Sequence, residues 1–74
     1  MENAIAEKLV TAKDIGEILC LSKRQIWRLN VSGKIPAPVR IGGSVRWRSS
    51  DIERWISLGC PDRRTFEAIR EVQR

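Results

Sequence analysis

The stretch that decides the fold is CLSKRQIWRLNVSGKIPAPVRIGGSVRWR, residues 20–48. Ser22 stands three positions before Gln25 at the start of an apolar repeat with helical spacing, which is the pattern of a capping box. Gly33 and the two prolines beyond it are unfavourable for continuing a helix. The pattern therefore predicts a helix that Ser22 opens and that runs to about Val31.

The second half of this stretch changes from helical to alternating spacing. Apolar and basic residues alternate between Val39 and Arg48, and Gly42-Gly43 lies between the two runs, where a tight turn needs positive φ. The pattern predicts a β-hairpin with one apolar face and one arginine face. The face that we expect to be buried holds Val39, Ile41, Val45 and Trp47, and the exposed face holds Arg40, Arg46 and Arg48.

A shorter helix is predicted just before residue 20. Thr11 and Asp14 have the spacing of another capping box, and apolar residues recur at helical intervals over about residues 12–19. Cys20 and Leu21 leave room for no more than a tight turn between the two helices. Two helices joined by a short turn and followed by a hairpin have the order of a winged helix-turn-helix, so the predicted fold class is mainly α with a small β-hairpin.

Two further helices are predicted after the hairpin. Ser50 and Glu53 repeat the capping-box spacing before a helix that ends near Gly59, and Asp62 is placed to cap a final helix. The stripe of the third helix that we expect to be buried holds Ile52, Trp55 and Ile56. A chain of 74 residues has room for one small domain. The predicted division is a flexible tail at residues 1–8, the winged helix-turn-helix domain at 9–59 and a C-terminal helix at 60–74.

Composition argues against several classes of function. The chain has no histidine and no CxxC pair, so we expect no metal site and interpret Cys20 and Cys60 as small apolar packing residues. The sequence holds neither a glycine-rich phosphate loop nor a nucleophile with a partner base, so we expect no enzyme activity and no cofactor. It also has no apolar run that could span a membrane or act as a signal segment, which predicts a cytoplasmic protein without a membrane partner.

Positive charge is concentrated in the middle of the chain. Residues 21–48 hold seven Lys and Arg and no Asp or Glu, although the whole chain has a net charge of only +5. A concentration of one sign is typical of a polyanion-binding surface, with an ordinary solvated basic face as the alternative. Because glycine and proline interrupt the stretch, it lacks the continuous amphipathic helix that a membrane surface would favour. Nucleic acid is the predicted partner.

The helix after Ser22 has a basic face opposite its apolar one. With Ile26 at 0°, Arg24 falls at about 160° and Arg28 at about 200° on a helical wheel of 100° per residue. Trp27 lies on the flank, where packing at the boundary of the core and contact with a base or sugar are both possible readings. Lys23 and the free amides of the first turn offer a phosphate site. Trp47 and Trp55 are expected in the core.

Three segments, LSKRQIWRL, GKIPAPVRIGG and VRWRSSDIERWI, resemble the AlpA-type prophage regulators and phage excisionases, which are relatives of the MerR winged-helix domain. The resemblance implies binding of double-stranded DNA, with the second helix in the major groove and the wing beside it. Cys20 departs from the family, which usually has glycine in that turn. The DNA-contacting residues that the resemblance implies are Lys23, Arg24, Gln25, Trp27, Arg28, Arg40, Arg46 and Arg48.

The resemblance leaves the biological role open between a transcriptional regulator of a mobile element and an excisionase that directs recombination. An integrase or RNA polymerase is a further expected partner. We expect a monomer in the free state that binds adjacent DNA sites cooperatively, because the sequence shows no coiled coil or large apolar face. The alternative from another class is a protein-interaction module, in which the Trp27 flank and the last helix dock an integrase or a transcription component.

Overall fold

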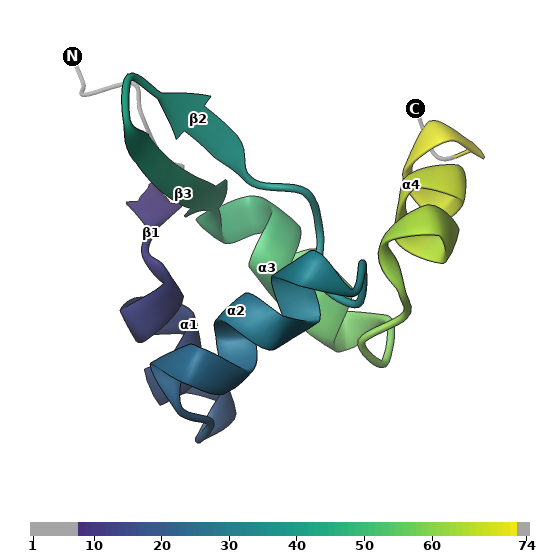
Figure 1. Cartoon of the computed structure of the whole chain (residues 1–74). Coiled ribbons are helices and arrows are strands. Elements are labelled where there is room, and N and C mark those ends of the chain that lie inside the picture. Colours follow the sequence, from purple (N-terminus) through teal and green to yellow (C-terminus); the bar gives the residue numbers. More distant parts are fainter. Residues whose placement is uncertain (1–7, 73–74) are drawn as a thin grey trace, which may run out of the picture.

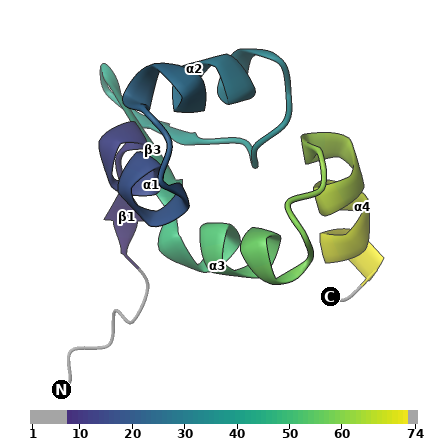
Figure 2. The same ribbon diagram turned by 90° about the horizontal axis from the view of Figure 1, so that it is seen from below.

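The computed structural model describes residues 8–72 and confirms the fold class of a winged helix-turn-helix (Figure 1). A three-stranded antiparallel sheet has the strand order β1-β3-β2, so the hairpin gains a third strand that the sequence did not predict. Figure 2 shows α2 and α3 in separate layers, with α1 and the sheet on one side and α4 on the other. The elements are β1 (Leu9–Val10), α1 (Ala12–Leu19), α2 (Lys23–Val31), β2 (Val39–Ile41), β3 (Ser44–Arg48), α3 (Ser49–Ser57) and α4 (Arg63–Val72).

The expected flexible tail at residues 1–8 lies outside the described residues except for Lys8. The backbone N–H of Lys8 donates to Ser49 Oγ at 3.0 Å, and the N–H of Ser49 donates to the Lys8 carbonyl at 2.8 Å. These bonds extend the pairing of β1 with β3 toward the first residue of α3. Lys8 is therefore tied to the sheet through its backbone.

The turn between α1 and α2 depends on close backbone contact. Cys20 ends α1 in the left-handed region with φ 60°, and the N–H of Leu21 donates to the Gly16 carbonyl at 2.8 Å. A Cβ at Gly16 would lie 2.6 Å from the Leu21 carbonyl oxygen. The turn therefore requires a glycine at position 16, inside α1. Cys20, where the sequence departs from the usual glycine, therefore adopts a left-handed conformation that is unfavourable for a residue with a Cβ.

The prediction of one apolar and one arginine face on the hairpin is wrong for β2. Directly paired residues of antiparallel strands project from the same face, and Arg40 pairs with Val45 while Val39 pairs with Arg46. Arg40 therefore shares the face of Val45 and Trp47. Because the Gly42-Gly43 turn pairs the residues on either side of it, alternation shifts by one place across the turn. Ile41, expected to be buried, is 55% exposed.

The start of α3 also differs from the sequence prediction. Its N-cap residue is Arg48, which makes no side-chain capping bond, so the expected box between Ser50 and Glu53 is absent. The chain passes from β3 into α3 without a loop, and Ser49 instead receives the bond from Lys8. Ile56 was expected in the buried stripe of this helix but is 38% exposed.

One core joins all four helices and the sheet. Both tryptophans expected there are buried, and each indole N–H has an acceptor: Trp47 donates to the Pro36 carbonyl at 2.8 Å and Trp55 to the Pro61 carbonyl at 2.6 Å. Phe66 brings α4 into the same core. The largest fully buried side chains are Trp47, Phe66, Ile15, Ile26, Ile35, Ile52 and Pro36.

The prediction that Cys20 and Cys60 are small apolar packing residues is wrong. Cys20 and Cys60 are both exposed and both have positive φ, at 60° and 59°. Each lies where the chain reverses after a helix, α1 in one case and α3 in the other. Turn geometry, which apolar spacing does not encode, places them at the surface.

Candidate nucleic-acid interface

The N-terminal end of α2 is fixed by its predicted capping box. The N–H of Gln25 donates to Ser22 Oγ at 3.1 Å, and the N–H of Ser22 donates to Gln25 Oε1 at 2.9 Å. This reciprocal pair leaves Lys23 and Arg24 exposed in the first turn. Because the oxygen of its side chain is engaged, Gln25 keeps its amide NH₂ for a further partner.

The outer surface of α2 carries the arginines that the helical wheel places opposite Ile26. Arg24 and Arg28 are exposed one turn apart, while Ile26 is fully buried. Together with Trp27 and Val31 they line a shallow depression, which we call the α2 face. Since α2 contains no acidic residue, nothing on the helix itself offsets this charge.

Trp27 contributes to both packing and surface. Its ring lies 5.6 Å from the Trp47 ring, centroid to centroid, at an interplanar angle of 56°. This tilted pair anchors one side of Trp27 to the core, and the indole also lines the α2 face. Of the two readings left open by the sequence, boundary packing is thus observed, and a surface remains that a base or sugar could contact.

A second hollow, of about 300 Å³, lies where α1, α2 and β3 meet. Lys13 from α1, Lys23 from α2 and Arg46 from β3 line it, and we call it the three-cation hollow. Thr11, Ala12, Trp27 and Val45 complete its lining. Sequence reasoning did not select Lys13, because Lys13 belongs to the acidic first part of the chain and only tertiary packing brings it beside Lys23.

Arg46 is held in place at the rim of this hollow. It is half-buried, and its Nη1 donates to the carbonyl of Val45 at 2.9 Å. Asp14 lies within its electrostatic reach: hydrogen bonds from Thr11 chiefly hold the pKa of this carboxyl below its ordinary value, and Lys13 and Arg46 lower it further. The cations of the hollow are therefore partly organised before any ligand binds.

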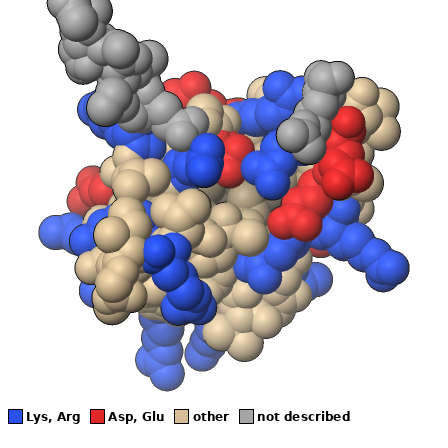
Figure 3. All heavy atoms as spheres, turned by 90° about the horizontal axis from the view of Figure 1, so that it is seen from above, with Lys and Arg blue, Asp and Glu red and all other residues tan. Residues whose placement is uncertain are grey.

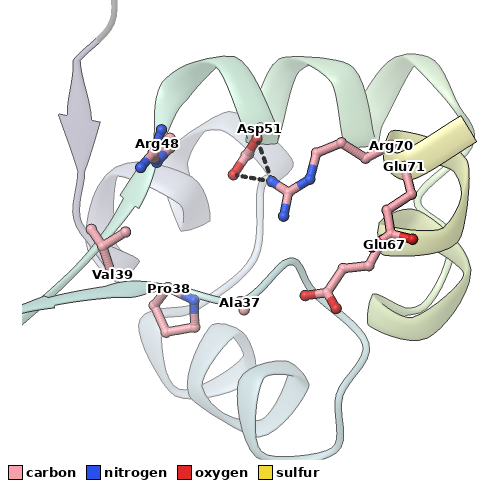
Figure 4. A pocket seen from close by; sticks show the side chains of 8 residues that line it. All are labelled: Ala37, Pro38, Val39, Arg48, Asp51, Glu67, Arg70 and Glu71. Atoms are coloured by element: carbon pink, nitrogen blue, oxygen red, sulfur yellow. Dashed lines mark hydrogen bonds and ion pairs between the residues drawn. The ribbon is translucent and has the colours of Figure 1, made fainter. Parts of the chain in front are cut away.

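Arg40 and Arg48 do not join this group. Arg40 is exposed on the edge strand β2, and Arg48 lines a different cavity, between the base of the hairpin, α3 and α4 (Figure 4). Arg70 bridges that cavity with its Nη1 at 3.2 Å from Asp51 Oδ2. The cavity is lined by Ala37, Pro38, Val39, Arg48, Asp51, Glu67, Arg70 and Glu71. Its three carboxylates make it a poor site for phosphate.

The surface charge follows the same division. In Figure 3, Lys and Arg side chains project around most of the outline, whereas the largest group of Asp and Glu side chains lies on the side of α4. The cations of the α2 face and the three-cation hollow come from α1, α2 and β3. The linings of these two sites contain no carboxylate, whereas α4 carries both signs of charge.

No helix within residues 8–72 combines the length and apolar character needed to cross a bilayer. In comparison with known proteins, residues 9–57, well over half of the chain, match the family model of the helix-turn-helix domain. No curated protein and no solved structure matches the chain. The matched segment runs from β1 to the end of α3 and so contains both helices of the motif and the whole hairpin. The chain therefore belongs to the helix-turn-helix domain family and is a DNA-binding protein of that class.

Proposed function

We propose that the chain reads a specific duplex DNA site by placing α2 in the major groove. The observation that carries this proposal is the α2 face, on which Arg24 and Arg28 project together from a helix whose first turn is fixed by a capping box. The major groove admits a helix, and an arginine can make two hydrogen bonds to guanine there. Lys23 and Gln25 lie in the turn that enters the groove first.

The three-cation hollow grips a backbone phosphate beside the groove. Lys13, Lys23 and Arg46 surround it from three elements, and phosphate contacts fix orientation without reading sequence. Arg40 on the edge strand of the wing supplies a further contact to the backbone or a minor groove. Arg48 contributes less than the sequence implied, since it lines the cavity that holds carboxylates.

In the cell this activity serves a mobile element, as the resemblance to prophage regulators and excisionases implies. The protein either controls transcription of such an element or directs an integrase toward excision, and an integrase or RNA polymerase is its protein partner. It acts in the cytoplasm, is a monomer when free and binds adjacent sites cooperatively. A pure protein-interaction module is less well supported, because two arginines flank Trp27 on the α2 face and three cations line the neighbouring hollow, whereas neither lining contains a carboxylate.

Selection of binding sites from a random duplex pool tests the proposal. The wild-type chain should enrich one sequence, and Arg24→Ala or Arg28→Ala should weaken binding to that sequence much more than to random duplex. Loss of one bidentate arginine–guanine pair costs about 1–3 kcal/mol of discrimination, or roughly 5- to 150-fold. Titration of labelled duplexes at fixed salt gives both affinities.

Arg54→Ala is the matched control, since Arg54 is an exposed arginine on α3, in the layer opposite α2 (Figure 2). It should leave the ratio of specific to random affinity unchanged. Failure to enrich any duplex sequence would overturn the proposal, and so would an equal effect of all three substitutions on the ratio.

A further inference from the structure

Helix α4 lies outside the segment that matches the helix-turn-helix family, yet its first residue contacts the far end of α2. Arg63 Nη2 donates to the Asn30 carbonyl at 3.2 Å and to Asn30 Oδ1 at 2.9 Å. Arg63 Nε donates to the carbonyl of Ile35 at 3.1 Å. The backbone N–H of Arg63 adds a bond of 2.9 Å to the Gly33 carbonyl. One residue therefore ties together the end of α2 and the loop that leads to the wing.

These bonds meet a need of α2 itself. The last carbonyls of a helix lack partners within the helix, and a cation near them is favourable because of the helix dipole. Asn30 is in the last turn of α2, and its carbonyl receives Arg63 in addition to a longer bond from the N–H of Gly33, at 3.3 Å. Within residues 8–72, the side chain of Arg63 donates its hydrogen bonds to uncharged oxygens. Its guanidinium acts as a C-terminal cap for α2, supplied from another element.

Two other contacts join α4 to the rest of the domain. Phe66, one turn beyond Arg63, is 1% exposed in the core. Arg70 pairs with Asp51 at the start of α3. The cap is therefore anchored to the body of the domain.

We infer that Arg63 is a positioning residue for DNA recognition: it holds the C-terminal end of α2 and the approach to the wing at the angle that lets both meet the duplex together. The inference rests on the proposed function. This role requires the planar guanidinium of arginine, because Nη2 bonds Asn30 while Nε bonds the carbonyl of Ile35. Lysine has a single charged nitrogen and cannot reproduce that geometry.

The first test uses the free protein. Arg63→Met keeps the aliphatic stem and removes every side-chain donor, Arg63→Lys keeps the charge, and Arg64→Met removes an exposed charge from the next position of α4. Amide hydrogen exchange followed by NMR should accelerate about tenfold at Ser32, Gly33 and Lys34 in both Arg63 variants. It should be unchanged in Arg64→Met, and the Ile26 amide, bonded to Ser22 at the other end of α2, should be unaffected throughout.

The second test uses the DNA site selected by the wild-type chain. Both Arg63 variants should lower the ratio of specific to random affinity about five- to tenfold, a part of the discrimination that a bidentate contact provides. The slope of log K against log salt should not change, because the guanidinium of Arg63 is bonded to Asn30 and Ile35 and is not one of the proposed phosphate contacts. A slope shallower by about one unit would overturn the inference by showing direct contact with DNA.

Rescue of the ratio by Arg63→Lys would show that charge alone matters and would also overturn the inference. So would a ratio in Arg63→Met equal to that in Arg64→Met. If the wild-type chain selects no duplex, the proposed function fails, while the exchange data still report on the cap. Should Arg63→Met not fold, Asn30→Ala removes one acceptor of the fork and should lower the ratio in the same direction by a smaller factor.

Discussion

The helix pair α1–α2 and the hairpin β2–β3 carry similar numbers of basic residues, but only the pair presents them as the sequence predicts. Arg24 and Arg28 lie opposite the buried Ile26, because the angle between residues of one helix is fixed by its own hydrogen bonds. In the hairpin the turn length decides which residues share a face, and Arg40 is separated from Arg46. The direction in which a side chain projects is therefore fixed by local geometry in a helix. In a hairpin it also depends on the length of the turn that connects the two strands.

Glycine provides the sharpest contrast between the two regions. Gly16→Ala places a Cβ 2.6 Å from a backbone oxygen of the turn, whereas Gly43→Ala in the hairpin meets no atom within 4 Å. We expect Gly16→Ala to lower the free energy of unfolding by about 1–3 kcal/mol, as for overpacked sites. Gly43→Ala, the matched control, should change it by less than about 0.5 kcal/mol. Urea denaturation measures both, and equal effects would contradict a close-packed turn.

The wing arginines should differ in their contact with phosphate. If about six phosphates are neutralised, the slope of log K against log salt for random duplex should be near −5. Arg46→Ala should make that slope shallower by about one unit, and Arg48→Ala should leave it nearly unchanged. The reason is that Arg46 lines the three-cation hollow and Arg48 the cavity with three carboxylates. Titrations at several salt concentrations provide the test, and the reverse order would place DNA on the α4 side.

The sequence predicted the features that neighbouring residues determine. The starts of α1 and α2 follow from capping boxes at Thr11 and Ser22, and both boxes form. The expected box at Ser50 fails because β3 continues directly into α3, so that Arg48 is the N-cap residue and Ser50 lies inside the first turn. The prediction of which hairpin residues share a face was wrong, because it assumed that the alternation of apolar and basic residues continues unchanged across the turn. The two-residue turn shifts this alternation by one residue.

The candidate site divides in the same way. The α2 face could be drawn on a helical wheel, since all its members belong to one helix. The three-cation hollow and the cap at Arg63 each join elements that are distant in sequence. Lys13 and Arg63 have no local pattern that distinguishes them from other surface cations. Only the folded chain shows that Lys13 shares a hollow with Lys23 and Arg46, and that Arg63 bonds Asn30 at the end of α2.

The turn between α1 and α2 contains backbone strain at Cys20. Cys20 has φ 60°, a conformation that costs a residue with a Cβ about 1–2 kcal/mol. Cys20→Gly should raise the free energy of unfolding by roughly 0.5–1 kcal/mol, because the greater freedom of glycine in the unfolded chain offsets part of the relief. Cys20→Ser, which keeps a Cβ, should give no gain. Thermal denaturation under reducing conditions compares the three chains, and a loss of stability in Cys20→Gly would show that the thiol contributes more than the strain costs.

The smallest expected effect is a loss of stability at acid pH, caused by carboxyl groups at the starts of two helices. Residues 39–48 contain no carboxylate, whereas Asp14 at the start of α1 and Asp62 at the start of α4 have pKa values below their ordinary 3.8. Hydrogen bonds from Thr11 to Asp14 and from Thr65 to Asp62 are the main cause.

Since the folded pKa of each of these carboxyls lies below the unfolded one, its stabilising contribution is complete above the unfolded pKa and is lost as pH falls through the folded pKa. Urea midpoints should therefore decline below about pH 4. Asp14→Asn keeps an oxygen acceptor but cannot titrate, so its midpoint should be lower at pH 6 and should decline less steeply than that of the wild type. A decline of the same steepness in Asp14→Asn and Asp62→Asn as in the wild type would show that other carboxylates govern the acid limb.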